Sequence, residues 1–202
     1  MRTKRVHKWG AWCGLALLVG ACGEDIGLSP EPEPEPNAPE DSRVNHVTNA
    51  DGTWTTVVDA TSSEVWVGVD LDGRTEADAA VDATWDLAIQ RFHVRTRGGV
   101  NGSGGVKVAV LEGADFGALS AAPASGYAED QPNEGTTQGT VFEREGGWYN
   151  YEVGTHKLTP KPLVYVVRSD QGRYFKVRIA NYYDAVGTSG VLSFQWAEVA
   201  AP

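Results

Sequence analysis

Apolar residues recur at every second position in several stretches of the chain, and this period of two is the feature that most restricts its fold. In "GVLSFQWAEV" Leu192, Phe194 and Trp196 alternate with other residues, and in "TWDLAIQ" Trp85 and Leu87 do the same. Side chains of a β-strand point alternately to opposite faces, so this pattern predicts strands with one buried face. A helix would need apolar residues at every third to fourth position, and we find no such segment longer than a turn or two.

Other segments extend this pattern. The segments "EVWVGVDL" (64–71) and "GVKVAVL" (105–111) are predicted strands, and "PLVYVVRS" and "RYFKVRIA" are a strand pair joined by Asp170-Gln171-Gly172, a typical hairpin turn. In "RYFKVRIA" Phe175 and Val177 face one way, and Lys176 and Arg178 face the other. The segment "EADAAVDA" (76–83) is a candidate for a short helix. The sequence therefore predicts an all-β fold, a single antiparallel, sandwich-like domain over residues 47–202, which is long enough to bury a core.

The first 21 residues have the features of a secretory signal peptide. Four basic residues precede the short apolar run "LALLV", which is too short to span a membrane. The next residues, Val19-Gly20-Ala21-Cys22, match the bacterial lipoprotein box, in which a peptidase cuts before a cysteine that already carries diacylglycerol. We therefore expect residues 1–21 to be removed and Cys22 to be lipidated. The alternative is an ordinary signal peptide cleaved nearby and a chance cysteine.

Lipidation would place the mature protein on a membrane, because two or more acyl chains give stable attachment. Gly23 follows the cysteine, and by similarity to other Gram-negative lipoproteins the absence of Asp there favours the outer membrane, on its periplasmic or cell-surface face. The following segment contains "SPEPEPEP", in which proline and repelling charges favour an extended, solvated chain. We interpret residues 22–46 as the lipidated cysteine and a disordered tether; a proline-rich protein-binding motif is the alternative.

The expected cleavage also limits the chemistry of the mature domain. It would remove Cys13 and the only methionine, and lipidation would occupy Cys22, so no thiol would remain for an iron–sulfur cluster or a cysteine zinc site. Any metal or haem ligand would then be His46, His93, His156, a tyrosine or a carboxylate. The chain has 17 basic and 27 acidic residues, and loss of residues 1–21 leaves 13 basic against the same 27. Such an acidic surface repels phosphate backbones, so nucleic acid is excluded as a partner.

Motifs of known enzyme classes are missing from the sequence, which predicts a protein that is not an enzyme. We find no G-x-S-x-G, no H-E-x-x-H and no phosphate-binding loop. The glycine-rich "GGVNGSGG" (98–105) lacks the Lys-Ser/Thr of such a loop and is interpreted as a strand connection. The segment "DLDGRTEAD" gathers Asp70, Asp72, Glu76 and Asp78 but lacks the bidentate glutamate of a calcium-binding hand. We interpret it as a solvated acidic turn.

Two histidines lie in stretches that suit ligand binding. In "LAIQRFHVRTRGG" the apolar face changes sides between Ile89 and Phe92, which predicts a bulge or sharp bend near Gln90-Arg91. His93 would then lie on the polar side, where it suits an anionic ligand but equally an ordinary solvent-facing surface. His156 in "WYNYEVGTHKLTPKP" follows several aromatic residues, which suit a haem pocket but also an aromatic strand without a ligand. His46, at the end of the tether, is expected to have no specific role.

Several of these segments, taken in order, resemble the HmuY family. The segment "TWDLAIQRFHVRTRGG" is similar to the family's W-D-hydrophobic-A-aromatic…R-T-N-G-G motif, and "GSGGVKVAV" to the glycine turn and strand that follow it. The segment "LVYVVRSDQGRYFKVRIANYYD" resembles the family hairpin, and "SGVLSFQWAEV" its closing strand. The resemblance spans about Trp54 to Val199, and it rests on motifs of the scaffold.

The resemblance implies a mostly β, envelope-anchored lipoprotein that captures haem for uptake and works with an outer-membrane haem receptor. It implies two axial ligands to the haem iron, for which His93 and His156 are the candidates, with nitrogens roughly 4 Å apart across the iron. The haem propionates would favour Arg91, Arg95 or Lys157. The alternative is a surface-binding, adhesion or structural β-module of the same fold that binds no haem, with distant histidines.

Overall fold

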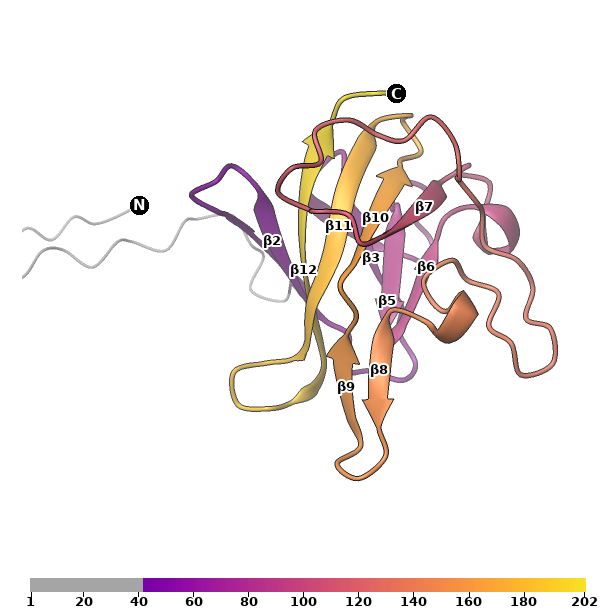
Figure 1. Cartoon of the computed structure of the whole chain (residues 1–202). Helices are drawn as coiled ribbons and strands as arrows, with labels where there is room; N and C mark the ends of the chain where they lie inside the picture. The colour runs from indigo at the N-terminus through magenta and orange to yellow at the C-terminus, as the bar shows by residue number, and fades with distance from the viewer. Residues whose placement is uncertain (1–41) are drawn as a thin grey trace, which may run out of the picture. The chain divides into compact units, whose positions relative to one another are not determined.

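Residues 42–202 are the part of the chain that the computed structural model describes (Figure 1). The predicted signal peptide, the predicted lipidation site Cys22 and the predicted tether up to residue 41 lie outside the described residues. Within 42–202 the structure contains no helix of the length and apolar character that crossing a membrane requires. The first strand starts at Val44, so the last residues assigned to the tether form part of the folded domain.

Two antiparallel sheets and one small hairpin make up the domain. The large sheet has the order β1-β2-β12-β11-β10-β7 and the small sheet the order β4-β3-β5-β6, while β8 and β9 pair with each other. The strands are β1 (Val44–Thr48), β2 (Trp54–Asp59), β3 (Val67–Asp70), β4 (Thr75–Asp78), β5 (Leu87–Gln90), β6 (His93–Thr96), β7 (Lys107–Glu112), β8 (Tyr149–Glu152), β9 (Lys157–Pro160), β10 (Leu163–Arg168), β11 (Tyr174–Tyr183) and β12 (Ser189–Val199). Two short 3₁₀ turns, η1 (Gly99–Asn101) and η2 (Arg144–Gly146), lie in the connections. The predicted all-β, antiparallel fold is confirmed.

The core lies between the two sheets. Leu192 and Phe194 on β12 and Leu87 and Ile89 on β5 are each at most 2% exposed, and all four belong to one apolar cluster. Each such side chain contributes about 1.5–3 kcal/mol when it is fully buried. Because the alternating residues of both sheets meet in this cluster, the sheets pack face to face as a sandwich.

The predicted hairpin at Asp170-Gln171-Gly172 is present. Strands β10 and β11 pair antiparallel up to Arg168 opposite Tyr174, and Gly172 in the turn has a φ of +80°. Lys176 faces away from the core as predicted, yet it is buried. Its ammonium group donates to the carbonyl oxygens of Phe116 (2.8 Å) and Leu119 (2.9 Å), because the connection after β7 crosses this outer face of the large sheet.

The predicted short helix at 76–83 is wrong. Its first residues belong to β4, which pairs with β3, and Ala77 is buried against this sheet. The rest is a turn in which the Asp78 carboxylate accepts a hydrogen bond from Ala80 N. An isolated helix this short has too few hydrogen bonds to offset its nucleation, so pairing with β3 prevails.

The glycine-rich segment 98–105 connects β6 to β7, as interpreted from the sequence. Gly99 has a φ of +58°, and a Cβ there would lie 1.9 Å from the carbonyl oxygen of Asp130. Only glycine permits that approach. The connection therefore packs closely against the backbone at Asp130. The loop that begins at Gln131 borders the candidate site.

Candidate functional site

The bend predicted near Gln90-Arg91 is a two-residue hairpin turn. Strands β5 and β6 pair antiparallel, with Gln90 opposite His93 and Arg91-Phe92 between them. The sharp bend is thus confirmed, whereas a bulge in one continuous strand is not what forms. Arg91 has a φ of +54°, a conformation that a tight reversal of two strands requires. The turn places His93 at the first position of the edge strand β6.

Arg91 holds this turn in place. Its backbone N donates to Ala60 O (2.8 Å), and its guanidinium donates to Thr61 O (2.9 Å) and to the Ser189 hydroxyl (3.1 Å). The sequence suggested Arg91 as a partner for a haem propionate. In this structure the guanidinium instead ties the β5–β6 turn to the segment that follows β2 and to the first residue of β12.

His93 is held by a buried carboxylate. Its Nδ1 lies 2.8 Å from Oε1 of Glu143, whose side chain is 6% exposed, and the same oxygen accepts from Val94 N at 3.2 Å. A carboxylate can only accept, so Nδ1 carries the proton and Nε2 keeps its lone pair when the ring is neutral. The imidazole is 36% exposed. When the ring is neutral, the arrangement therefore leaves Nε2 unprotonated and able to bind a ligand.

This histidine should titrate above its usual range. The hydrogen bond to Glu143 raises the pKa of His93 above 6.5, against a smaller lowering by burial. Because the pKa is higher in the folded state, the stabilisation from this pair is complete below about pH 6.5 and is lost as the pH rises through the folded pKa. We expect an NMR titration to place the His93 pKa above 6.5 and Glu143→Gln to lower it. An unchanged His93 pKa in Glu143→Gln would contradict this pairing.

A hollow of about 390 Å³ opens beside His93 and Glu143. This volume falls in the range of small-molecule sites. Its lining is mostly polar and includes Trp66, Gln90, His93, Arg95, Val100, Asn101, Gln131, Pro132, Asn133, Gln138, Thr140 and Glu143. The hollow therefore combines one histidine, one arginine and several amide groups with a single large aromatic ring.

Arg95 forms the charged wall of this hollow. Its guanidinium stacks over Trp66 at 4.0 Å and lies 5.4 Å from the centre of the Trp85 ring. Its Nε is buried and has no hydrogen-bond partner among residues 42–202. Burial lowers the pKa of Arg95, which nonetheless stays charged. A fixed cation with unused hydrogen-bonding capacity is suited to an anionic group.

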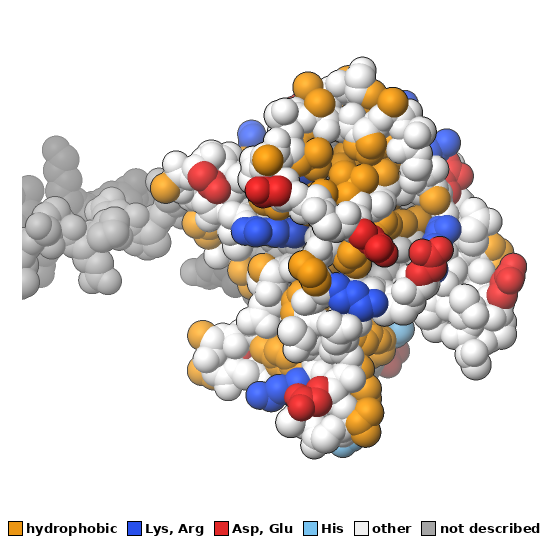
Figure 2. All heavy atoms as spheres, in the orientation of Figure 1, with side chains coloured by type: hydrophobic (Ala, Val, Ile, Leu, Met, Phe, Trp, Pro, Cys, Tyr) orange, Lys and Arg blue, Asp and Glu red, His pale blue; other side chains and the backbone are white. Residues whose placement is uncertain are grey.

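His156 lies at the tip of the β8–β9 hairpin. It has a φ of +57°, and its Nδ1 is hydrogen-bonded to the Tyr151 hydroxyl. Val153 is 74% exposed and Tyr151 51% exposed, so the tip presents apolar surface to solvent, seen at the bottom of Figure 2. Lys157, the next residue, is also exposed and opens β9.

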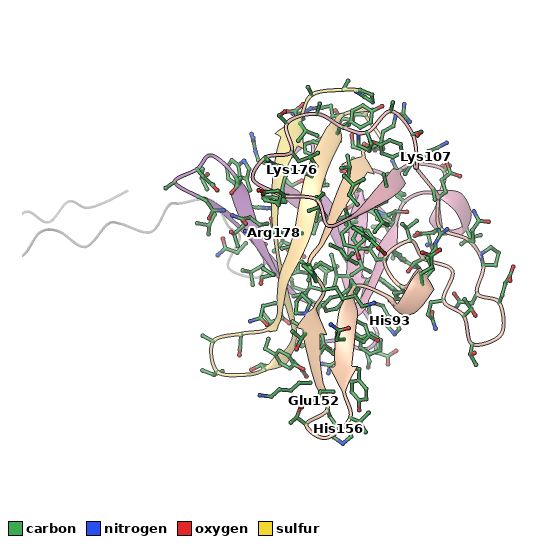
Figure 3. The ribbon with its side chains drawn as sticks, in the orientation of Figure 1. His93, Lys107, Glu152, His156, Lys176 and Arg178 are labelled. Carbon is green, nitrogen blue, oxygen red and sulfur yellow. The ribbon has the colours of Figure 1, made fainter. Side chains whose placement is uncertain are left out.

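The structure does not bring His93 and His156 together. Phe92, next to His93, packs against Tyr149 at the start of β8, with ring centres 5.8 Å apart. His156 is beyond the other end of that strand, about 10 Å further along given the rise per residue. Figure 3 shows His93 near the base of the hairpin and His156 at its tip. Two axial ligands to one iron would require the hairpin to move.

His46 has a structural role that the sequence did not predict. Its Nδ1 lies 2.8 Å from the Thr56 hydroxyl, and its ring meets Trp196 edge-on at 6.3 Å between centres. Burial lowers the pKa of His46. This histidine is part of the pairing of β1 with β2 and lies outside the hollow.

Glu143 and Trp66 are the site residues that sequence reasoning missed. Glu143 follows His93 by 50 residues in "FEREGGW", where no motif distinguishes it from its acidic neighbours. Trp66 lies between Val65 and Val67 in "EVWVGV", on the opposite face of the predicted strand. A large aromatic residue on that face was the one sequence feature that could have marked Trp66 as a site residue.

Together, the two sheets and the hollow define a β-sandwich protein with a hollow of small-molecule size at the edge of its small sheet. The family model described as HmuY protein matches residues 62–196, which is more than half of the chain. The chain belongs to the HmuY family. No curated protein matches it in a sequence comparison.

Several solved structures share the fold, and three of them illustrate the similarity. A candidate lipoprotein of Bacteroides fragilis has a TM-score of 0.60 at 20% identity, over 80% of this chain and 97% of its own. The apo HmuY analog of Tannerella forsythia has a TM-score of 0.57 at 18% identity, over 73% of this chain and 95% of its own. A candidate HmuY-like haem-binding protein of Bacteroides vulgatus has a TM-score of 0.55 at 22% identity, over 76% of this chain and 95% of its own.

Proposed function

We propose that this protein is a haem-binding, non-enzymatic protein and that His93 is its first axial ligand. The observation that carries the proposal is the contact between His93 Nδ1 and the buried Glu143. Histidines that bind metals almost always donate their second ring N–H to such a group, which fixes the ring and raises its basicity. Family membership supports haem as the ligand, and one Bacteroides vulgatus relative is described as a haem-binding candidate.

Two further groups of the hollow, Arg95 and Trp66, and the adjacent Phe92 suit the periphery of haem. Arg95 offers a charged partner to a propionate, and Trp66 and Phe92 offer ring faces near the imidazole. His156 is proposed as the second ligand, supplied by a movement of the β8–β9 hairpin. The same hairpin tip carries Tyr151, which is hydrogen-bonded to His156 and would share that movement.

A hemin titration of the full-length chain in detergent tests this proposal. We expect a saturable, shifted Soret band at one hemin per chain, its loss in His93→Ala, and an affinity about 10–100-fold lower in Glu143→Gln. His156→Ala should change the spectrum of the bound hemin if the hairpin supplies the second ligand. His46→Gln is the matched control for a histidine outside the hollow. A spectrum equal to that of free hemin, or binding unchanged in His93→Ala, would overturn the proposal.

A second candidate function is capture of a polar, anionic small molecule without haem. The separation of His93 from His156 and the amide-rich lining of the hollow favour it. If hemin does not bind, a screen of carboxylate and phosphate compounds by thermal shift tests this alternative, and loss of any response in Arg95→Gln would place the ligand in the hollow.

We propose further that Cys22 carries lipid and holds the protein on the outer membrane, where a haem receptor would be its partner. The lipoprotein box at 19–22 and the proline- and glutamate-rich segment that follows support the anchor. Labelled palmitate should be incorporated in cells by the parent chain and not by Cys22→Ala; incorporation that survives this change would argue against the anchor.

A further inference from the structure

Three carboxylates lie together at the end of β5 that is away from the His93 turn, and Asp170 lies beside them. Asp70 is the last residue of β3, Asp72 lies in the turn between β3 and β4, and Asp86 directly precedes β5. Asp170 comes from the turn between β10 and β11, and its backbone N donates to Asp86 at 3.0 Å. The site therefore joins three segments that are distant in sequence.

The spacing of three of these carboxylates suits one cation. Asp70, Asp72 and Asp86 each offer an oxygen, and these oxygens lie within 4.8 Å of one another. Calcium binds oxygen at about 2.3–2.6 Å, so two of its ligands are separated by at most about 5 Å. The spacing of the three oxygens is therefore compatible with one shared calcium ion.

Two oxygens of the cluster have no partner. The side chain of Asp72 is 2% exposed; its Oδ1 accepts from Arg173 at 3.3 Å, while its Oδ2 is buried and unpaired among residues 42–202. Asp170 repeats this pattern, since its Oδ2 accepts from Arg97 at 2.6 Å and its Oδ1 is buried without a partner. A buried carboxylate oxygen without a donor is costly, so each of these points to a missing positive ligand.

The charge of the cluster is only partly balanced. Four carboxylates face two guanidinium groups, and one of these, Arg173, also pairs with Glu198. The Asp86 carboxylate accepts from the backbone N of Leu71 and from that of Asp170, both at 3.0 Å. These donors carry no formal charge, so the ionised cluster keeps a net negative charge.

We propose that Asp70, Asp72 and Asp86 form a calcium-binding site that ties the β3–β4 turn to β5 and to the β10–β11 turn. The ligands are oxygen atoms only, which suits a hard cation, and their irregular arrangement suits calcium better than the strict octahedron of magnesium. Asp70 and Asp72 are therefore buried binding groups, and the interpretation of "DLDGRTEAD" as a solvated turn is wrong for these two residues.

Thermal unfolding of the full-length chain in detergent tests the site. With chelated protein as the reference, about 5 mM calcium should raise the Tm by about 5–9 °C if the dissociation constant is about 0.1 mM, and magnesium should raise it less. Asp72→Asn should lose this rise and keep a Tm in chelator at or above that of the parent, because it removes a buried charge that Arg173, shared with Glu198, balances only in part. The exposed Glu134→Gln is the control and should respond as the parent does.

A direct measurement of calcium binding is the second part of the test. Isothermal titration calorimetry with calcium chloride should give one site per chain, with an affinity at least 10-fold weaker in Asp72→Asn. If Asp72→Asn does not fold, Asp70→Asn serves as the second variant. A Tm that calcium leaves unchanged in the parent, or an undiminished response in both variants, would overturn the proposal.

Discussion

Replacing Asp130 with alanine is expected to lower the free energy of unfolding by about 3–4 kcal/mol. The carboxylate is fully buried and accepts four hydrogen bonds. Oδ2 accepts from Thr96 N (2.7 Å), the Thr96 hydroxyl (3.0 Å) and Asn101 Nδ2 (2.9 Å), and Oδ1 accepts from Val141 N (2.8 Å). Removing the acceptor leaves these donors unpaired inside the domain.

Asp130 also links the fold to the site. Its partners lie on β6, in the 3₁₀ turn η1 and at the end of the loop that includes Gln131, Pro132 and Asn133, which line the hollow. Asp130→Ala should therefore weaken hemin binding as well as stability. Urea unfolding measures the first effect, with an unchanged m-value as the check that the unfolded state is the same.

The neighbouring Glu129→Ala is the control for this change. The Glu129 side chain forms a surface ion pair with Lys107 at 3.5 Å, and such pairs contribute at most about 1 kcal/mol. Asp130→Asn should be intermediate between the two, because it keeps the volume and one acceptor. A loss below about 1 kcal/mol in Asp130→Ala would show that the freed donors are satisfied by water or by a shift of the loop.

The strands were predictable because burial of one face leaves a period of two in the sequence. Leu192, Phe194 and Trp196 on β12 and Leu87 on β5 were placed correctly on this basis alone. The alternating pattern gives the wrong exposure where another part of the chain covers the outer face of a sheet. Lys176 has the pattern of a solvent-facing residue and is buried, because a connection from a distant part of the chain supplies its carbonyl partners.

The candidate site was predictable only in part. His93 could be singled out from its own segment, but the partner that gives it chemical character, Glu143, comes from a connection without regular structure. The prediction of a solvated acidic turn at "DLDGRTEAD" was wrong for the same reason. Asp70 and Asp72 alone resemble part of a solvated loop, and the cluster is complete only with Asp86 and Asp170 from other segments. Both the His93–Glu143 pair and the carboxylate cluster form only when distant segments meet in the fold, so neither can be predicted from one segment of the sequence.

Replacing Trp148 with alanine is expected to cost about 3–5 kcal/mol, and with phenylalanine about 1–3 kcal/mol. The indole is 1% exposed, meets Tyr149 at 4.9 Å between ring centres, and donates from Nε1 to the carbonyl oxygen of Phe92 at 2.9 Å. Alanine leaves a cavity, whereas phenylalanine keeps most of the packing and removes the hydrogen bond. Urea unfolding of both variants separates the two contributions.

The hydrogen bond from Trp148 is placed to affect the site, because Phe92 is the residue before His93. Trp196→Phe is the matched control: that indole is also buried and donates from Nε1 to the Thr56 hydroxyl at 2.7 Å, but it lies outside the hollow. We expect both phenylalanine variants to lose similar stability, and only Trp148→Phe to shift the His93 pKa and weaken hemin binding. Equal changes in the His93 pKa in the two variants would contradict this role of Trp148. The β5–β6 turn would then be held by Arg91 and by the pairing of β6 with β5, and the orientation of the imidazole would depend on Glu143 alone.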